Sequence, residues 1–197
     1  MSEERVNRIL AAAYVCFARH GLRKTIMDDI ATAAGMSRPA VYQYIRNKQD
    51  AFRRVATGIF DTALGEARAA ADAGGTLTQR LDRVLAVKLD TTARLLRDNP
   101  YAIDLIRANA DLDRAFAAAL IDLLTATIAD AATDADLRLG DRNAREVAEL
   151  ALALTRGLEV ELLVDGTGTL DKPRERLRNG IALLVAGLAA ATKPARA

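Results

Sequence analysis

The sequence predicts an all-α protein of about nine helices, three in a basic N-terminal part and six in the rest of the chain. Apolar residues recur at the spacing of helices, and no segment alternates convincingly with the two-residue period of strands. About half of the 197 residues are hydrophobic, which is enough to form a substantial buried core. We expect an N-terminal domain over residues 1–48 and a second helical domain over residues 49–197.

The first helix is expected from about Glu3 to Arg19, with an apolar stripe along one face. Gly21 follows, and glycine readily adopts the left-handed conformation found just beyond helix ends. The single cysteine, Cys16, excludes an internal disulfide and fits a reducing compartment. Because Cys16 lies in the apolar stripe, we interpret it as a buried structural cysteine rather than a redox thiol.

Two short helices joined by a tight turn are expected next. Thr25 is the predicted N-cap of the first, with Asp28 completing a shortened capping box. Gly35 supplies the backbone conformation that the turn needs. Ser37 is the predicted N-cap of the second helix, whose first turn accommodates Pro39.

Six further helices are expected in the remainder of the chain. Candidate N-caps are Thr76 or Thr78, Asp111 and Asp141, and Asn99-Pro100 ends one helix. The expected helices cover about residues 49–71, 76–99, 101–108, 111–132, 141–164 and 173–191.

Positive charge is concentrated near the N-terminus. Residues 1–54 hold ten Lys and Arg against five Asp and Glu, whereas the remaining residues carry 18 basic and 21 acidic side chains. A basic N-terminal part on an otherwise acidic chain favours a polyanion as its partner. A solvated surface with chance asymmetry is the alternative explanation of these totals.

The most informative segment is residues 25–52, TIMDDIATAAGMSRPAVYQYIRNKQDAF. A short helix, a turn at Gly35 and a helix restarted at Ser37 form the pattern of a helix-turn-helix. The second helix is too polar at Arg38, Gln43 and Arg46 to be a core helix. Such a helix suits a DNA major groove, where residues of its N-terminal turns reach base edges.

In this segment the sequence resembles the TetR family of one-component regulators. The resemblance covers about residues 5–55 and is carried by Phe17, Gly21, Thr25, Ile30, Ala31, Ala34, Gly35, Ser37, Tyr42, Tyr44, Lys48 and Phe52. Ile45 stands where the family usually has phenylalanine, and Val41 where it has leucine or phenylalanine, but both remain apolar. Beyond residue 55 the resemblance is limited to six helices of suitable length.

The resemblance implies a DNA-binding surface, and the chemistry of the residues supports it. Thr25 and Ser37, at helix N-termini, and Lys48 are expected to hold phosphates. Arg38 is the candidate for a two-point contact with guanine, and Gln43 for a contact with adenine or a phosphate. The other candidates are Pro39 and Ala40, against a thymine methyl group, and Tyr42 and Tyr44, of which one is expected at a phosphate and the other partly in the core.

The resemblance also implies a homodimer, in which the last two helices of each chain form a four-helix bundle. The segment VAELALAL, residues 147–154, is apolar nearly all round and must be covered on both sides. Paired subunits also fit palindromic half-sites, whereas core packing within a monomer is the alternative. The residues expected at the interface are Val147, Leu150, Ala151, Leu154, Leu158, Leu177, Gly180, Ile181, Leu184 and Leu188, with Gly187 allowing close backbone approach.

Polar residues within apolar segments are the candidates for an effector site. They are Lys88, Tyr101, Arg107, Asn109, Arg156 and Glu159. Several are equally well explained as surface residues or as pairs, such as Arg156 with Glu159. Aromatic residues make up only 4 % of the chain and tryptophan is absent, which favours a flexible, largely aliphatic effector over a stacked planar one.

Together these features predict a sequence-specific transcriptional regulator, interpreted as a repressor that a small, largely apolar effector releases from a palindromic operator. We expect no cofactor and no metal site. An all-α enzyme is disfavoured because no catalytic motif is recognised, and a ligand-independent architectural DNA-binding protein is the other alternative. No secretory signal and no run of about 20 apolar residues is recognised, so we expect a cytoplasmic protein that does not bind membranes.

Overall fold

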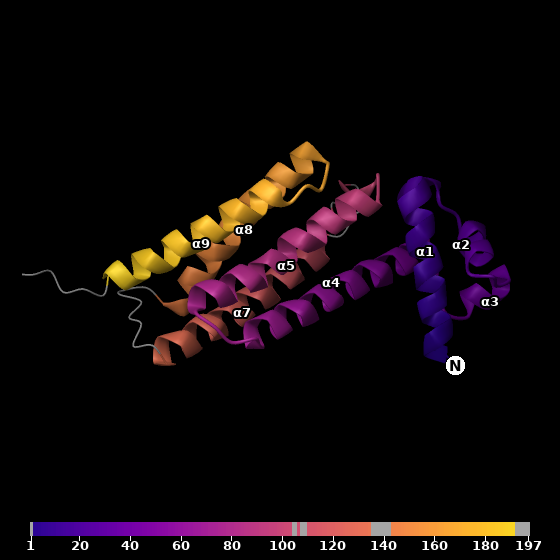
Figure 1. The fold of residues 1–197 in the computed structure, drawn as a ribbon. Coiled ribbons are helices and arrows are strands. Elements are labelled where there is room, and N and C mark those ends of the chain that lie inside the picture. Colours follow the sequence, from indigo (N-terminus) through magenta and orange to yellow (C-terminus); the bar gives the residue numbers. More distant parts are fainter. Residues whose placement is uncertain (1, 104–105, 107–109, 135–142, 192–197) are drawn as a thin grey trace, which may run out of the picture. The chain divides into compact units, whose positions relative to one another are not determined.

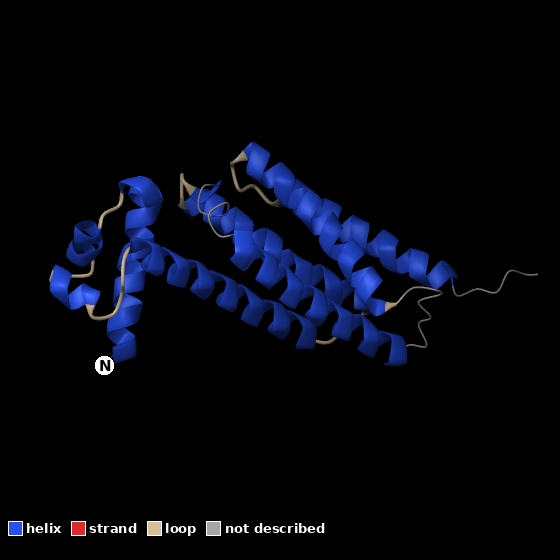
Figure 2. Cartoon of the chain, turned by 180° about the vertical axis from the view of Figure 1, so that it is seen from behind, coloured by secondary structure: helices blue, strands red, loops and turns tan. Residues whose placement is uncertain are grey.

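The computed structural model describes residues 2–103, 106, 110–134 and 143–191, and within these ranges it contains helices and no strand (Figures 1 and 2). The predicted all-α class is therefore confirmed. The ninth expected helix, at about 101–108, falls largely outside the described residues, although Ala102, Ile103 and Ile106 are helical. The described helices are α1 (Ser2–Lys24), α2 (Met27–Ala33), α3 (Arg38–Tyr42), α4 (Lys48–Asp72), α5 (Leu77–Asp98), α7 (Ala110–Asp134), α8 (Ala144–Asp165) and α9 (Asp171–Ala191).

The chain divides into two compact units, which are described separately. The first unit comprises Met1–Asp61 and Leu95–Asp113, and the second comprises Thr62–Arg94 and Arg114–Ala197. Helices α1, α2 and α3 belong to the first unit, whereas α8 and α9 belong to the second. Compactness does not test where the DNA-binding function ends, so the functional boundary expected after residue 48 stays a prediction.

The core of the first unit joins α1, α2, α3 and the start of α4. Phe17 and Phe52 meet edge to face with ring centroids 5.3 Å apart, an arrangement that the charge distribution of aromatic rings favours. Ile30, Val41 and Ile45 are fully buried beside them. Ile30, Val41 and Ile45 therefore form part of the inner side of the helix-turn-helix.

Helix α1 is longer than expected and is interrupted at Gly21. This residue has φ 72° and ψ 162°, a conformation that residues other than glycine rarely adopt. A Cβ atom there would also lie 3.1 Å from the ring of Tyr101. The positive φ expected at Gly21 is confirmed, but the chain becomes helical again and ends at Lys24 instead of near Arg19.

The predicted N-cap of α2 was one residue early. The N-cap is Ile26, whose backbone N–H donates to the Asp29 carboxylate at 2.9 Å. Isoleucine has no side-chain acceptor, so only this half of a capping box can form. Thr25 and Asp28, which the sequence pattern assigned to the box, make other contacts.

The turn and the start of α3 are as expected. Gly35 has a φ of 63°, and the half-buried Met36 packs against the core beside it. Ser37 is the N-cap of α3, and its Oγ accepts a hydrogen bond from the Ala40 N–H at 3.4 Å. The position of the exposed side of α3 is therefore fixed by both its cap and its buried residues.

In the second unit, reciprocal caps begin α5 and α8. Thr76 is the cap of α5, because its Oγ1 accepts from the Gln79 N–H while the Gln79 side chain accepts from the Thr76 N–H. Asn143 and Glu146 form the same arrangement at α8. The choice of Asp141 as this N-cap was therefore wrong, and Asp141 itself lies outside the described residues.

Helices α8 and α9 lie side by side in the second unit (Figures 1 and 2). Gly180 of α9 allows this approach, because a Cβ atom there would overlap the side chain of Leu154. Arg176 of α9 also donates to Glu161 of α8 at 2.7 Å. The close approach at Gly180 is thus made within one chain.

Helix α7 is apolar enough to satisfy the length and composition expected of a membrane span. The segment Ala110–Thr133 has a window with a mean hydropathy of 1.6, contrary to the expectation that no stretch comes close. Phe116, Leu120 and Leu124 are nevertheless buried in the second unit, and Asp122 pairs with Arg145 at 3.1 Å. We therefore interpret α7 as a core helix, with Asp111 in its first turn instead of at its N-cap.

Candidate DNA-binding surface

The helix-turn-helix presents a polar face whose position is set by buried residues on the same segment. Val41 and Ile45 are fully buried, whereas Arg38, Tyr42 and Gln43 between and before them are exposed. Val41 and Ile45 are four positions apart, so both point into the core while the opposite side faces solvent. Among the other candidates, Ser37 and Pro39 are exposed and Ala40 is half-buried.

Arg38 is held in place by two neighbours. Its guanidinium lies 3.3 Å from the Asp28 carboxylate, donates to the Tyr42 hydroxyl at 3.4 Å, and lies 5.5 Å from the centre of the Tyr42 ring. The hydrogen bond to Tyr42 and the charge of Asp28 raise the pKa of Arg38, which keeps it charged. All three side chains are exposed, so these contacts are readily exchanged for others.

The two tyrosines have the two different environments that were expected. Tyr42 is 42 % exposed, whereas Tyr44 is half-buried against the core and accepts a hydrogen bond from Arg5 at 3.1 Å. This hydrogen bond raises the pKa of Arg5. The pairing of Arg5 with Tyr44 spans 39 residues, and no local sequence signal indicates it.

Thr25 lies in the interior instead of at a helix N-terminus. Its side chain is fully buried, and its hydroxyl is directed at the carbonyl oxygens of Gly21, 2.8 Å away, and Cys16, 3.2 Å away. A hydroxyl in this position is not available to a phosphate. The assignment of Thr25 as a side-chain phosphate contact is therefore corrected to a structural role.

Lys48 also has a structural role that the sequence did not indicate. Its Nζ donates to the carbonyl oxygens of Leu22, Arg23 and Thr25, each at 3.0 Å. These carbonyls lie at the end of α1, where helices leave acceptors unpaired and where positive charge is favoured. Lys48 thus fastens the start of α4 to the end of α1, and its expected contact with phosphate stays untested.

The four candidate effector residues that the structure describes do not form one cluster. Lys88 and Glu159 are paired at 3.1 Å inside the second unit, and Glu159 also accepts from Thr92 at 2.6 Å. Lys88 lies over the ring of Phe116 at 5.5 Å. Glu159 thus pairs with Lys88 on α5, whereas the alternative considered from the sequence was a pair with its helix neighbour Arg156.

The other effector candidates take no part in this pair as far as the structure describes them. Arg156 is exposed. Tyr101 belongs to the first unit, where its ring packs on Gly21. Arg107 and Asn109 lie outside the described residues. Among the described candidates, polarity within an apolar segment therefore identified one buried ion pair, Lys88 with Glu159, and did not identify a common binding site.

Most residues expected at the dimer interface are covered within the chain. Six are buried in the second unit, namely Val147, Ala151, Leu158, Leu177, Ile181 and Leu188. We therefore remove these six from the expected interface. Leu150 is exposed, and Leu154, Gly180 and Leu184 are half-buried. Val160, Val164 and Leu183, which were not among the expected interface residues, are also exposed. The periodicity of apolar residues in the sequence can show that a helix has two apolar faces, but it does not show which face packs within the same chain.

Comparison with known proteins gives a family match at the N-terminus and a fold match over the whole chain. Residues 9–55 match the model of the family described as bacterial regulatory proteins, tetR family. This span contains α2, α3 and every residue of the polar face. No curated protein matches the chain in sequence.

Three solved structures illustrate the fold match. A proposed transcriptional regulator from Pseudomonas aeruginosa PAO1 is 20 % identical with a TM-score of 0.72, covering 96 % of this chain and 92 % of its own. SmeT, the repressor of the Stenotrophomonas maltophilia multidrug efflux pump SmeDEF, is 18 % identical with a TM-score of 0.69, covering 92 % and 89 %. The fatty acid degradation regulator FadR from Bacillus halodurans is 14 % identical with a TM-score of 0.64, covering 97 % of each chain.

A helix-turn-helix with a polar outer face, followed by a larger helical unit, defines a class of DNA-binding transcriptional regulators. Within that class, residues 9–55 match the tetR family model, and the whole chain has the same fold as the solved regulators compared above. The resemblance read from residues 5–55 is therefore confirmed.

Proposed function

We propose that the protein is a homodimeric repressor that reads a palindromic operator through α3 and leaves it when a small apolar effector binds. The observation that carries this proposal is the exposed polar face of α3, whose orientation is fixed by the buried Val41 and Ile45. A base-reading surface needs this combination, because a helix must enter the groove in one defined rotation.

Arg38 is the residue that we expect to read a base. Its planar guanidinium can donate two hydrogen bonds to the O6 and N7 atoms of guanine. To do so it exchanges the carboxylate of Asp28 for the base edge, and an exposed ion pair of this kind contributes only about 0–1 kcal/mol. Gln43 and Tyr42 lie on the same exposed side, as candidates for a base edge and a phosphate.

Exposed apolar side chains on α8 and α9 support a dimer. They are Leu150, Val160 and Val164 on α8 and Leu183 on α9, and Val164 and Leu183 are 83 % and 75 % exposed. Gly157 and Gly187 are exposed on the same helices, with no atom within contact distance of a Cβ placed on either. Apolar side chains and small residues on two adjacent helices suit packing against the same two helices of a second chain.

Regulation by a small molecule is supported by one of the structural relatives. SmeT is matched also as its complex with triclosan, at 19 % identity and a TM-score of 0.64, over 95 % of this chain and 91 % of that one. We propose an apolar effector here too, acting in the cytoplasm, with no catalytic step. An effector that binds better to a DNA-incompatible conformation would shift the population away from operator binding.

The proposal is tested by measuring binding to the DNA upstream of the protein's own gene. Fluorescence anisotropy should give saturable, salt-sensitive binding by a species of two chains, as judged by sedimentation. Arg38→Ala should weaken binding by about 5- to 150-fold, the range expected for loss of a two-point base contact. The matched control is Arg68→Ala, because Arg68 is an exposed arginine of α4 in the second unit.

Three results would contradict the proposal. Equal binding by the parent and Arg38→Ala would exclude α3 as the reading helix in the orientation argued here. A protein that stays monomeric at working concentrations would exclude recognition of a palindromic operator by a homodimer. DNA binding without any sequence preference would favour an architectural protein, which has the same basic surface but no operator.

A further inference from the structure

Arg5 of α1 and Tyr44, which follows α3, meet on the exposed surface of the first unit. The Arg5 Nη1 atom donates to the Tyr44 hydroxyl oxygen at 3.1 Å, although the two residues are 39 positions apart in the sequence. Arg5 is exposed, whereas Tyr44 is half-buried and packs against the core. The contact brings a cation and a hydroxyl group together beside the helix that carries Arg38.

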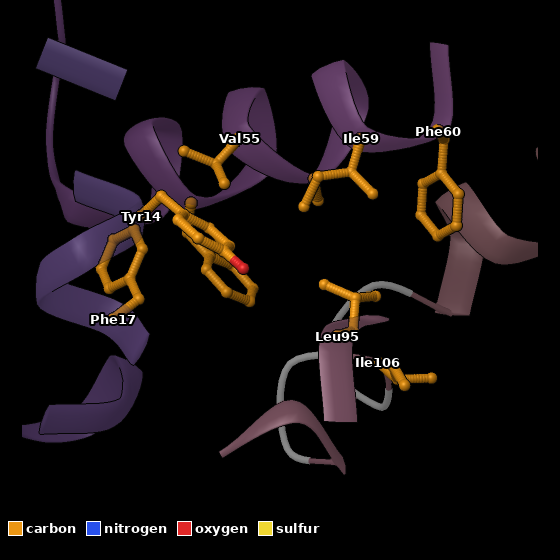
Figure 3. Close-up of a pocket in the computed structure, with 9 residues that line it drawn as sticks. Tyr14, Phe17, Val55, Ile59, Phe60, Leu95 and Ile106 are labelled. Atoms are coloured by element: carbon orange, nitrogen blue, oxygen red, sulfur yellow. The ribbon is translucent and has the colours of Figure 1, made fainter. Parts of the chain in front are cut away.

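Arg5 lies on the side of α1 that packs into the core. Ile9, four positions later, is fully buried, and residues at this spacing share one face of a helix. Further along α1, Phe17 packs edge to face on Phe52 of α4. Figure 3 shows Tyr14 and Phe17 of α1 with residues of α4 around a small apolar hollow. Because α1 is packed at these points, the backbone that carries Arg5 has a defined position in the first unit.

Tyr44 is fixed relative to α3 by backbone hydrogen bonds. The N–H groups of Tyr44 and Ile45 both donate to the carbonyl oxygen of Val41 at 3.0 Å, so the chain continues the turn of α3 beyond its last residue. Tyr44 comes six positions after Arg38, which corresponds to ~9 Å along a helix axis. This length is comparable with the ~12 Å width of the DNA major groove. With Arg38 at a base edge, Tyr44 would therefore lie near the phosphates that border the groove.

The two side chains keep hydrogen-bond donors for a further acceptor. A hydroxyl group can accept and donate at the same time, so the Tyr44 hydroxyl, which accepts from Arg5, still has its own hydrogen to donate. A guanidinium has several N–H donors, of which this contact uses one. Among the described residues no carboxylate forms an ion pair with Arg5, in contrast to Arg38 beside Asp28. The pair therefore offers a positive charge and two kinds of donor to an oxyanion.

A phosphate of the DNA backbone is the oxyanion that this pair suits. Charged donors form short, strong hydrogen bonds to phosphate, and the guanidinium group matches the geometry of phosphate oxygens. Both groups are attached to the structure around α3, so a duplex that α3 enters brings its backbone to them. Neither group is placed to read a base, and a backbone contact of this kind fixes orientation without carrying sequence information.

We propose that Arg5 and Tyr44 together hold one phosphate of duplex DNA beyond the C-terminal end of α3. The inference rests on the proposed function, and it adds a residue of α1 to a DNA-binding surface otherwise drawn from α3 and its flanking residues. Arg38 reads a base at one end of this segment, while the Arg5–Tyr44 pair holds the backbone at the other. Contacts at both ends keep α3 in one register in the groove.

The salt dependence of DNA binding by the full-length protein tests this inference. Fluorescence anisotropy between about 50 and 200 mM salt gives the affinity for the DNA upstream of the gene and for an unrelated duplex of equal length. Arg5→Gln should weaken binding to both duplexes by the same factor, about tenfold per subunit, as for the loss of one charged hydrogen bond. The slope of log affinity against log salt should become shallower by about 0.9 per subunit, the value for one phosphate.

Arg8→Gln is the matched control, because Arg8 is an exposed arginine about one turn further along α1. It should leave the salt slope unchanged. Tyr44→Phe removes the hydroxyl group and keeps the ring. Its effect should be non-additive with that of Arg5→Gln, since both changes remove the same phosphate contact, and additive with that of Arg8→Gln. Circular dichroism checks the folding of each variant, and the exposed position of Arg5 makes Arg5→Gln a change outside the core.

The outcomes separate this inference from the proposed function. If Arg5→Gln weakens binding at an unchanged salt slope, Arg5 only packs α1 against Tyr44 and the inference fails. It fails equally if Arg8→Gln has the same effect on the slope, or if Arg5→Gln and Tyr44→Phe are additive. If the parent prefers its operator and Arg5→Gln binds like the parent, the inference fails and the proposed function stands. If the parent has no sequence preference but Arg5→Gln lowers the slope on both duplexes, the phosphate contact stands and operator recognition fails.

Discussion

Lys48 illustrates how a residue can carry a family pattern for a reason other than the expected one. Its ammonium group donates to three carbonyl oxygens at the end of α1, which would otherwise lack partners within the helix. Loss of such a charged donor leaves these acceptors to solvent and to each other. The stability of the first unit therefore depends on Lys48, whether or not Lys48 also contacts DNA.

We expect Lys48→Met to lower the free energy of unfolding by about 1–3 kcal/mol, as for hydrogen bonds that involve a charged group. Urea unfolding followed by circular dichroism measures this loss, with Lys24→Met, a change at an exposed lysine, as the control. If Lys48→Met is as stable as the parent but binds DNA more weakly, Lys48 is a phosphate anchor and not a fastening for α1.

Asp50 makes the first unit sensitive to acid. Burial alone would raise the pKa of this carboxyl group, but the Arg46 N–H at 3.0 Å and the Arg54 guanidinium at 3.0 Å outweigh burial, and the pKa is lowered from the ordinary value of 3.8. Because the folded pKa is below the unfolded one, the stabilisation is complete above the unfolded value and is lost as the pH falls through the folded value.

Asp50→Asn should therefore be less stable than the parent at neutral pH, and the difference should shrink as the pH falls below about 3.9, the usual aspartate pKa. Urea midpoints of the two proteins across that range measure the effect. A difference that is constant with pH would mean that the Asp50 charge contributes nothing to stability.

At the residue scale, the sequence predicted burial well and partners poorly. Cys16 was interpreted as buried from its place in an apolar stripe, and the structure confirms this. The contact of Arg38 with Asp28 was not predicted, because it depends on the angle between α2 and α3. Thr25 was misplaced because a threonine before a short helix looks like an N-cap even when its hydroxyl is directed inward.

The two glycines of α9, Gly180 and Gly187, have different surroundings. Gly180 faces Leu154 of the same chain so closely that a Cβ atom would overlap it, whereas a Cβ on Gly187 would meet nothing within 4 Å. The two positions are seven residues apart on one helix. They therefore offer a matched pair of alanine substitutions with the same change in helix propensity.

We expect Gly180→Ala to lower the stability of the second unit relative to Gly187→Ala by about 1–3 kcal/mol, the usual cost of overpacking. In Gly187→Ala the chain should gain up to about 1 kcal/mol from helix propensity. Thermal unfolding of both variants measures the difference. Equal stability of the two would show that Leu154 moves aside without cost.

At the element scale, helix existence was easier to predict than helix ends. Each described helix corresponds to an apolar pattern in the sequence, whereas the N-caps of α2 and α8 were placed one and two residues early. The difference arises because a periodic stripe uses many residues, while a cap depends on one side chain among several that could serve. For α8, Asn143 and not Asp141 reaches the free N–H of Glu146.

At the scale of the whole molecule, the fold class and the polar face of α3 were predictable, but the apolar surfaces were not. Sequence periodicity gives the number of apolar faces on α8 and α9, and only packing decides that Leu158 lies inside while Val164 is exposed. A small hollow in the first unit was also not predictable from the sequence, because the nine residues that line it come from four separate segments. Their ordinary core composition gives no signal that a space lies between them.

The contact between Asp28 and Arg38 has a consequence for selectivity. A carboxylate lies 3.3 Å from Arg38, the arginine proposed to face the duplex, so in the proposed complex every approaching DNA meets a negative charge together with a positive one. Repulsion between Asp28 and phosphates would weaken binding to unrelated sequences and to the operator alike, but only the operator would offer Arg38 a guanine in compensation. The proposed regulator would thus distinguish its operator partly through a lowered affinity for all other DNA sequences.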